Sequence, residues 1–343
     1  MSWNKYYRIT PLRVINLAVA LSAVLLIVGF VSLCMGPANI HVKQVLMLFS
    51  DSGSIDQTTW MILFKIRLPR ILLAGVVGFS LSIGGVVFQA LLRNPLAEPF
   101  ILGVSSGSAV GAIAGIFFGL SIDLGVPFLS FMGALFTIFL VMGIGRRQGG
   151  LESSTLLLTG VIVNAFFTAI IMFFISTTSD TRLHSILFWL YGDLSQSRYS
   201  QLSISFPIII VVSAIVYVFS RHLNLLVGGE DSALQMGVDV ELVKWLLFLG
   251  ISLITGIAIS FSGIIGFVGL IVPHLMRMFI GPDHRLLITA SALGGASFMI
   301  AADTLARTII SPSELPVGVV TAFLGAPFFI YLLKQRGSRW IQN

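Results

Sequence analysis

The feature that most constrains this chain is a series of apolar segments with almost no charged residue. Residues 71–92, for example, run for 22 residues without a charge. A helix needs about 20 such residues to cross the ~30 Å hydrocarbon layer of a bilayer. Ten segments of this kind recur, at 14–36, 71–92, 99–121, 125–145, 155–178, 199–220, 242–262, 266–280, 286–306 and 315–333. The sequence therefore predicts an all-α integral membrane protein with ten transmembrane helices, forming a single transmembrane domain over residues 1–343.

The composition excludes an ordinary soluble domain. Hydrophobic residues make up 56% of the chain, charged residues 10%, and the mean hydropathy is +1.00. We expect none of the 14 carboxylates at the centre of a span. Because buried ionisable groups usually mark proton or sodium relays, this pattern disfavours an ion-coupled carrier. The net charge of +6 comes from basic residues scattered at segment ends, so we expect no nucleic-acid partner.

The longest charge-free run, residues 245–276, predicts a break in the helix. A single helix of 32 residues would be about 48 Å long, well beyond the bilayer. Ser262-Gly263 and Gly266 allow a tight turn in the middle of this run. We therefore expect one full span followed by a shorter returning helix.

The distribution of Lys and Arg predicts the orientation. With ten spans and the N-terminus inside, thirteen basic residues lie in inner connections and seven in outer ones. Inner connections carry the excess of Lys and Arg in membrane proteins. Both termini are therefore predicted to be cytoplasmic.

Two polar connections stand out. The turn at residues 93–99 contains two prolines, an asparagine and a glutamate, and we expect it at the membrane face. In the inner connection 221–241, Gly228-Gly229 ends one span, Glu230-Asp231 open a short helix, and Gly237 ends it. The stretch at about 228–240 is predicted to lie on the cytoplasmic face and present a knob to a soluble partner; an ordinary surface helix is the alternative.

No motif for chemistry appears. The sequence lacks the G-x-x-x-x-G-K-[ST] phosphate loop, because none of its five lysines follows a glycine. Its five histidines show no ligand spacing on one face, so no metal site is predicted. We therefore expect neither an enzyme nor a cofactor in this chain.

Residues 67–108 resemble the signature of the FecCD-type permease subunits of ABC importers for iron-siderophores, haem and vitamin B12. Three further blocks resemble family motifs in the family's order, with Met236 in place of the usual Leu. These blocks are SGIIGFVGLIVPHLMR at 262–277, ELPVGVVTA with GAP at 314–327, and GEDSALQMG at 229–237.

The resemblance implies the type II ABC importer permease fold and a location in the bacterial or archaeal inner membrane. The permease would pair with itself above two ATPase subunits, which carry ATP and Mg. A periplasmic or lipid-anchored binding protein would deliver the substrate, an iron-siderophore or a related metal chelate. Cobalamin and haem are the alternative substrates. An ion-coupled secondary transporter or a membrane-embedded enzyme would need intramembrane ionisable clusters, which the sequence does not predict.

The resemblance also implies roles for individual residues. Docking of the binding protein falls to Arg67, Arg70 and Arg307, although Arg307 could instead pair with Asp303 four residues away, and Arg67 and Arg70 could cap helices. The other implied positions are Gly229, Glu230, Asp231, Ala233 and Gly237 for ATPase coupling, Asn94, Leu96, Ser153 and Ser154 for the cytoplasmic gate, and Asn164, Thr168 and Thr321 for the pathway. For Asn94, capping of its own turn is the alternative.

Overall fold

The computed structural model describes residues 9–38, 40, 42, 44–45, 56–147, 150–178 and 180–336. These residues form a helical bundle with one small hairpin, β1 (Arg146–Arg147) and β2 (Gly150–Leu151). The helices are α1 (Pro11–Cys34), α3 (Gln57–Met61), the π-helix η2 (Ile62–Arg67), α4 (Leu68–Leu91), α5 (Val104–Phe117), α6 (Gly125–Gly145), α7 (Ser153–Thr177), α8 (Asp180–Leu190), α9 (Tyr199–Val218), α10 (Ser220–Val227), α11 (Glu230–Gln235), α12 (Val240–Ser262), α13 (Val268–Ile280), α14 (His284–Ala306) and α15 (Val317–Arg336).

Each of the ten predicted segments contains a helix, so the all-α prediction is confirmed for the described residues. Seven helices are long and apolar enough to cross a membrane, counting Gln57–Leu91 as one. The apolar runs of α5, α13 and α15 are shorter, 10–17 residues each. Ten crossings and cytoplasmic termini therefore stay predictions.

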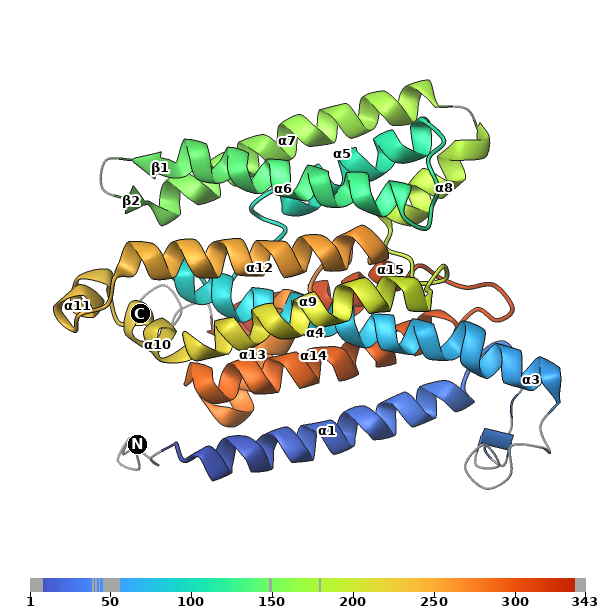
Figure 1. Cartoon of the computed structure of the whole chain (residues 1–343), viewed down its shortest axis with the longest axis horizontal. Coiled ribbons are helices and arrows are strands. Elements are labelled where there is room, and N and C mark those ends of the chain that lie inside the picture. The colour runs from blue at the N-terminus through green and yellow to red at the C-terminus, as the bar shows by residue number, and fades with distance from the viewer. Residues whose placement is uncertain are drawn as a thin grey trace.

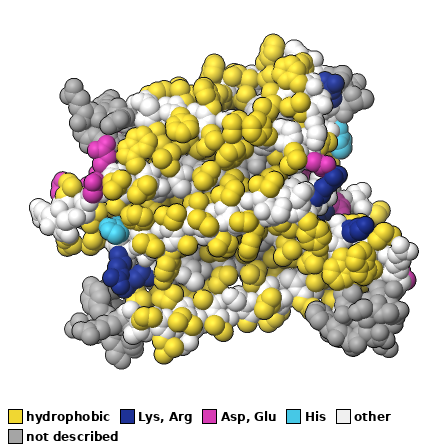
Figure 2. All heavy atoms as spheres, viewed as in Figure 1, with side chains coloured by type: hydrophobic (Ala, Val, Ile, Leu, Met, Phe, Trp, Pro, Cys, Tyr) yellow, Lys and Arg dark blue, Asp and Glu magenta, His cyan; other side chains and the backbone are white. Residues whose placement is uncertain are grey.

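The long helices lie side by side, from α7 through α6, α12 and α4 to α14 and α1 (Figure 1). On the face shown in Figure 2, apolar side chains cover the middle and charged side chains gather toward the two ends. This distribution suits a protein whose middle contacts lipid and whose ends contact water. The end that carries α3 and the end that carries α11 are called the α3 end and the α11 end below; α1 begins at the α11 end (Figure 1).

The helix α4 is the centre of the bundle. In the span Gln57–Leu91, 83% of the most apolar window is buried. A Cβ atom added at Gly78 would overlap the carbonyl oxygen of Gly295 in α14, and one added at Gly85 would overlap that of Gly269 in α13. Lipid supplies no hydrophobic drive between helices, so close backbone contact at small residues provides the packing. Glycines therefore allow α4 to pack in close backbone contact with α13 and α14.

The helix that contains the predicted span 71–92 begins well before residue 71. The Asp56 carboxylate accepts the backbone N–H of Thr59 at 3.0 Å and caps α3, which continues through η2 into α4. The rod Gln57–Leu91 has 35 residues and a length of about 50 Å, more than the ~30 Å hydrocarbon layer. Its first turns therefore extend toward the aqueous side at the α3 end.

The predicted break within 245–276 is confirmed. Helix α12 ends at Ser262 and α13 begins at Val268. Gly263 and Phe267 take φ angles of +69° and +70°. Glycine adopts this conformation without strain, and the reversal of the chain requires it.

The prediction that residues 93–99 lie at the membrane face is wrong for the second half of the turn. After α4 the chain runs through turns to Gly103, and Ala97 and Leu102 are 0% and 1% exposed. The Pro99 ring lies against Gly84 of α4, and the Leu102 backbone lies against Gly160 of α7. Irregular backbone is tolerated at membrane depth where protein surrounds it. This inserted segment shortens α5 relative to the predicted span 99–121.

Candidate functional site

The three arginines predicted to dock a partner meet in a buried cluster at the α3 end. Arg70 Nε lies 2.9 Å from Asp303 Oδ1, and its Nη1 lies 2.6 Å from Glu314 Oε2. Arg307 Nε lies 3.3 Å from Asp303 Oδ2, so the alternative (i, i+4) pair is formed. Arg67 donates to the carbonyl oxygens of Leu33 and Ala38, both at 2.6 Å, and so caps the end of α1.

Burial gives this cluster a structural role. Arg67, Arg70 and Arg307 are 3%, 5% and 2% exposed, and Asp303 is 1% exposed. The carboxylate side chain of Glu314 is 35% exposed and forms the open edge of the cluster. Removing one member of a buried ion pair costs about 3–5 kcal/mol, because the other charge is left uncompensated. Docking through the arginines stays a prediction, since in this conformation each has partners within the chain.

The predicted coupling segment forms a short helix at the α11 end (Figure 1). Gly229 and Gly237 bound α11 with φ angles of +127° and +82°. Ala233 is fully buried, whereas Leu234 and Met236 are 56% and 67% exposed. The helix therefore anchors through its alanine and presents apolar side chains outward, an arrangement suited to a protein partner.

Glu230 joins this helix to two other elements. Its carboxylate lies 2.7 Å from Lys244 Nζ of α12 and 3.6 Å from Arg93 Nη2. Arg93 directly precedes Asn94 of the predicted gate and takes a φ of +46°. The coupling segment and the gate turn thus share one carboxylate. Sequence reasoning chose Glu230 for its place in a motif and missed this contact.

The sequence did not predict a second connection between elements at this end. Asn224 Oδ1 of α10 accepts the backbone N–H of His284 at 2.9 Å and lies 2.7 Å from its Nδ1. Burial alone would raise the pKa of the neighbouring Asp283, but hydrogen bonds from Arg285 and Asn224 lower that pKa below its usual value. These contacts tie the helix that precedes α11 to the start of α14.

The predicted gate residues come from two elements at the α11 end. Asn94 Oδ1 accepts the backbone N–H of Leu96 at 2.9 Å, so the alternative role of Asn94 in its own turn is realised. Ser153 begins α7, and Ser154 Oγ donates to Glu152 Oε1 at 2.8 Å. Leu96 is 39% exposed. Their action as a gate stays a prediction.

The predicted pathway residues do not share one environment. Asn164 is exposed and Thr168 is half-buried on α7, where the Thr168 hydroxyl donates to the Asn164 carbonyl at 2.7 Å. Thr321 of α15 is 0% exposed and donates to the Gly318 carbonyl at 3.0 Å. An exposed asparagine in an apolar helix favours a surface covered by protein or water rather than by lipid.

A metal centre is not seen among the described residues, which hold no group of three or more His, Cys, Asp or Glu side chains. The expected lack of a cofactor in this chain stays a prediction.

Comparison with known proteins gives consistent matches. The family model described as the FecCD transport family matches residues 24–335. A cobalamin import system permease protein of Halobacterium salinarum is 45% identical over 83% of this chain and 76% of its own length. The hemin transport system permease protein of Yersinia pestis is 39% identical over 92% of this chain and 96% of its own length. The molybdate import system permease protein of Haemophilus influenzae is 37% identical over 92% of this chain and 96% of its own length.

A solved structure agrees with these matches. An inward-facing ABC transporter of metal-chelate type superposes with a TM-score of 0.83, at 33% identity, over 93% of this chain and 99% of its own. Together with the apolar helices, these relatives make the chain a multi-pass protein of the bacterial or archaeal inner membrane. The chain belongs to the FecCD transport family, as a permease of the ABC importer type.

Proposed function

We propose that this chain is the membrane subunit of a binding-protein-dependent ABC importer that moves an iron-siderophore or a related metal chelate inward. Two copies of the chain would form the pathway, a separate pair of ATPase subunits would supply the energy, and a periplasmic or lipid-anchored protein would deliver the substrate. The observation that carries the proposal is the family match over residues 24–335. Cobalamin is the second candidate substrate, because the Halobacterium salinarum relative at 45% identity is named for it.

The contacts at the α11 end supply a route from the ATPase to the gate. The exposed side chains of Leu234 and Met236 would rest on the ATPase subunit. Movement of α11 would carry Glu230, which lies 2.7 Å from Lys244 and 3.6 Å from Arg93. Because Arg93 and Asn94 are consecutive, this movement would shift the gate turn. Glu230 is therefore a positioning residue in the proposed cycle.

At the α3 end, the arginine cluster would receive carboxylates of the binding protein. Glu314 is the most exposed member of the cluster and already occupies Arg70. A carboxylate from a partner would replace Glu314 at this edge, since guanidinium groups bind carboxylates in defined planar geometries. Docking would then exchange one ion pair for another.

Uptake by the complete transporter tests the substrate. The permease, its ATPase and its binding protein are reconstituted into liposomes, and uptake of radioactive ferric siderophore is measured with competing cobalamin or haem. We expect ATP-dependent siderophore uptake that neither competitor reduces. ATP-dependent cobalamin uptake without siderophore uptake would replace the first candidate by the second.

A further inference from the structure

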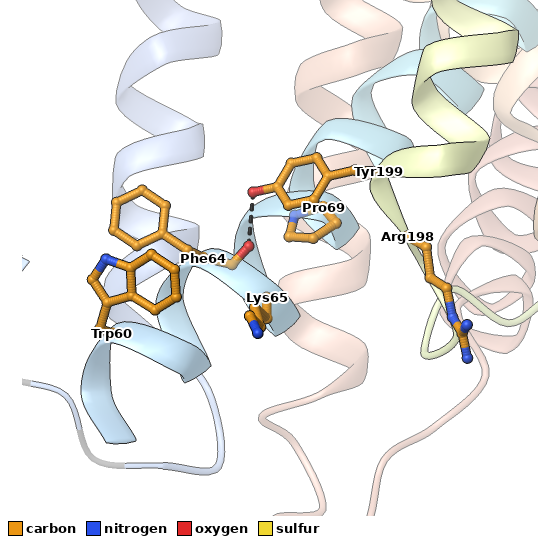
Figure 3. Close-up of a pocket in the computed structure, with 6 residues that line it drawn as sticks. All are labelled: Trp60, Phe64, Lys65, Pro69, Arg198 and Tyr199. Atoms are coloured by element: carbon orange, nitrogen blue, oxygen red, sulfur yellow. Dashed lines mark hydrogen bonds between the residues drawn. The ribbon is translucent and has the colours of Figure 1, made fainter. Parts of the chain in front are cut away.

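A pocket at the α3 end belongs to none of the proposed sites. It has a volume of about 550 Å³ and opens between the π-helix η2 and the start of α9 (Figure 3). Its lining combines aromatic rings, a proline and two cations: Trp60, Phe64, Lys65, Pro69, Arg198 and Tyr199.

Local contacts hold the walls together. The Tyr199 hydroxyl donates to the Phe64 carbonyl oxygen at 2.7 Å and so joins α9 to η2. The rings of Trp60 and Phe64 lie with their centroids 5.3 Å apart. The aromatic wall is therefore fixed by one hydrogen bond and one ring contact.

The pocket is polar on one side and apolar on the other. In Figure 3 the rings of Phe64, Pro69 and Tyr199 lie higher, toward the middle of the bundle, whereas the charged groups of Lys65 and Arg198 lie lower, toward the start of α3. The change from rings to cations thus follows the long axis of the helices, which is the axis expected to cross the bilayer.

The position along the helices matches the boundary of the hydrocarbon layer. Tyr199 is the first residue of the apolar span Tyr199–Val218, and Arg198 directly precedes it. Ile66 of the rod lies at the level of the pocket and is 57% exposed; toward the bilayer centre, Leu72 of the rod and Phe206 of α9 are 44% and 54% exposed. Tryptophan and tyrosine concentrate at this boundary in membrane proteins, with their rings at the level of the headgroups.

Arg198 already has one partner, Asp123, at 2.6 Å. The side chains of Arg198 and Asp123 are 56% and 41% exposed. An exposed ion pair of this kind contributes only about 0–1 kcal/mol, so a second anion can share the guanidinium. Counting Lys65, Arg198 and Asp123, the site keeps a net charge of +1.

We propose that this pocket binds an anionic phospholipid of the surrounding leaflet. The phosphate lies between Lys65 and Arg198, and the first carbons of the acyl chains lie against Phe64, Pro69 and Tyr199. A free phosphate ion would use only the cations and leave the apolar wall exposed to water, whereas a phospholipid satisfies both halves of the pocket. With the predicted orientation, the lipid belongs to the outer leaflet.

The test compares lipid retention by the complete transporter. Wild type and variants are reconstituted in vesicles of equal parts phosphatidylglycerol and phosphatidylcholine, extracted in mild detergent and weighed by native mass spectrometry. The Lys65→Gln/Arg198→Gln variant should lose its preference for phosphatidylglycerol by about thirtyfold, since each basic group near an anionic surface contributes ~1 kcal/mol, or about fivefold. The charge-conserving Lys65→Arg/Arg198→Lys variant should retain it.

Control variants separate the site from general surface charge. Arg182 is exposed in α8 but does not line this pocket, so Arg182→Gln should leave phosphatidylglycerol retention unchanged. Equal retention by wild type and the double Gln variant, with the transporter still assembled, would overturn the proposal. Full displacement of the bound lipid by millimolar inorganic phosphate would also overturn it and indicate a free-anion site. If the double Gln variant does not assemble, the test uses Lys65→Gln alone. This variant leaves the Arg198–Asp123 pair intact, and its preference for phosphatidylglycerol should fall about fivefold.

Discussion

At the scale of single residues, Asp303 shows how this bundle accommodates charge. It lies in the apolar helix α14 and is 1% exposed, yet Arg70 and Arg307 both contact its carboxylate. The sequence singles out the three arginines of this cluster as functional candidates, and it offers the Arg307–Asp303 pair as an alternative. It does not predict that Arg70 contacts Asp303, because the two are separated by 233 positions, and single-sequence patterns carry no information on such contacts.

The substitution Glu314→Gln tests docking through Arg70. The change removes the exposed carboxylate that occupies Arg70 Nη1 and leaves the buried Asp303 pair in place. If docking uses Arg70, we expect the binding protein to bind about fivefold more tightly, because it no longer competes with an internal charge-assisted hydrogen bond. Binding to the reconstituted permease, measured by surface plasmon resonance, gives the answer; weaker binding would exclude this exchange.

The substitution Glu230→Gln tests the route from the ATPase to the gate. It removes the contacts with Lys244 and Arg93, and a partly exposed pair contributes ~1 kcal/mol, or about fivefold. We expect about fivefold fewer substrate molecules imported per ATP hydrolysed, with the ATPase still bound. Glu241→Gln is the matched control, because Glu241 is an exposed carboxylate in the first turn of α12, just outside the coupling segment. An unchanged ratio of transport to hydrolysis in Glu230→Gln would contradict the route.

At the scale of helices, periodicity and charge predicted where most elements lie, including the break between α12 and α13. The rod Gln57–Leu91 and the inserted segment before α5 were not predicted. The predicted span began only at residue 71, and the turn at 93–99 was expected at the membrane face. Asp56 instead caps a helix, and the segment at 97–103 is enclosed by protein that includes Gly84 and Gly160. A sequence read alone does not show which glycines leave room for another backbone.

Glycine contacts of α4 give a prediction at this scale. A Cβ at Gly78 would overlap the Gly295 carbonyl of α14, whereas a Cβ at Gly29 of α1 would meet nothing within 4 Å. Gly78→Ala should therefore lower the free energy of unfolding by about 1–3 kcal/mol through overpacking. Gly29→Ala should leave it unchanged or raise it by less than about 1 kcal/mol, since alanine favours helix. Thermal unfolding in detergent compares the two; an equal melting temperature would refute the close contact.

At the scale of the whole molecule, the two ends of the bundle have different surfaces. The α11 end carries the short helix with exposed Leu234 and Met236, and the α3 end carries the arginine cluster. The sequence predicted this division correctly in outline, because it assigned the coupling segment and the arginines to opposite sides. The side of the membrane on which each end lies stays a prediction.

Replacing the outward face of α11 tests the partner at that end. Leu234→Ser/Met236→Ser removes exposed apolar contacts without touching the buried Ala233. We expect loss of most ATPase subunit on co-purification, because the buried core of an interface is apolar and a few residues there carry most of the binding energy. Val227→Ser, at a residue 51% exposed near the same end, should leave co-purification intact. Undiminished ATPase in the double variant would place the contact elsewhere.

The most direct test of the account is the energy source of transport. The permease is reconstituted alone and with its ATPase and binding protein, and accumulation of labelled metal chelate is measured against a concentration gradient. We predict accumulation only in the complete assembly with ATP, and none by the permease alone, with or without an ion gradient. Uphill transport by the permease alone would contradict its role as a membrane subunit driven by a partner.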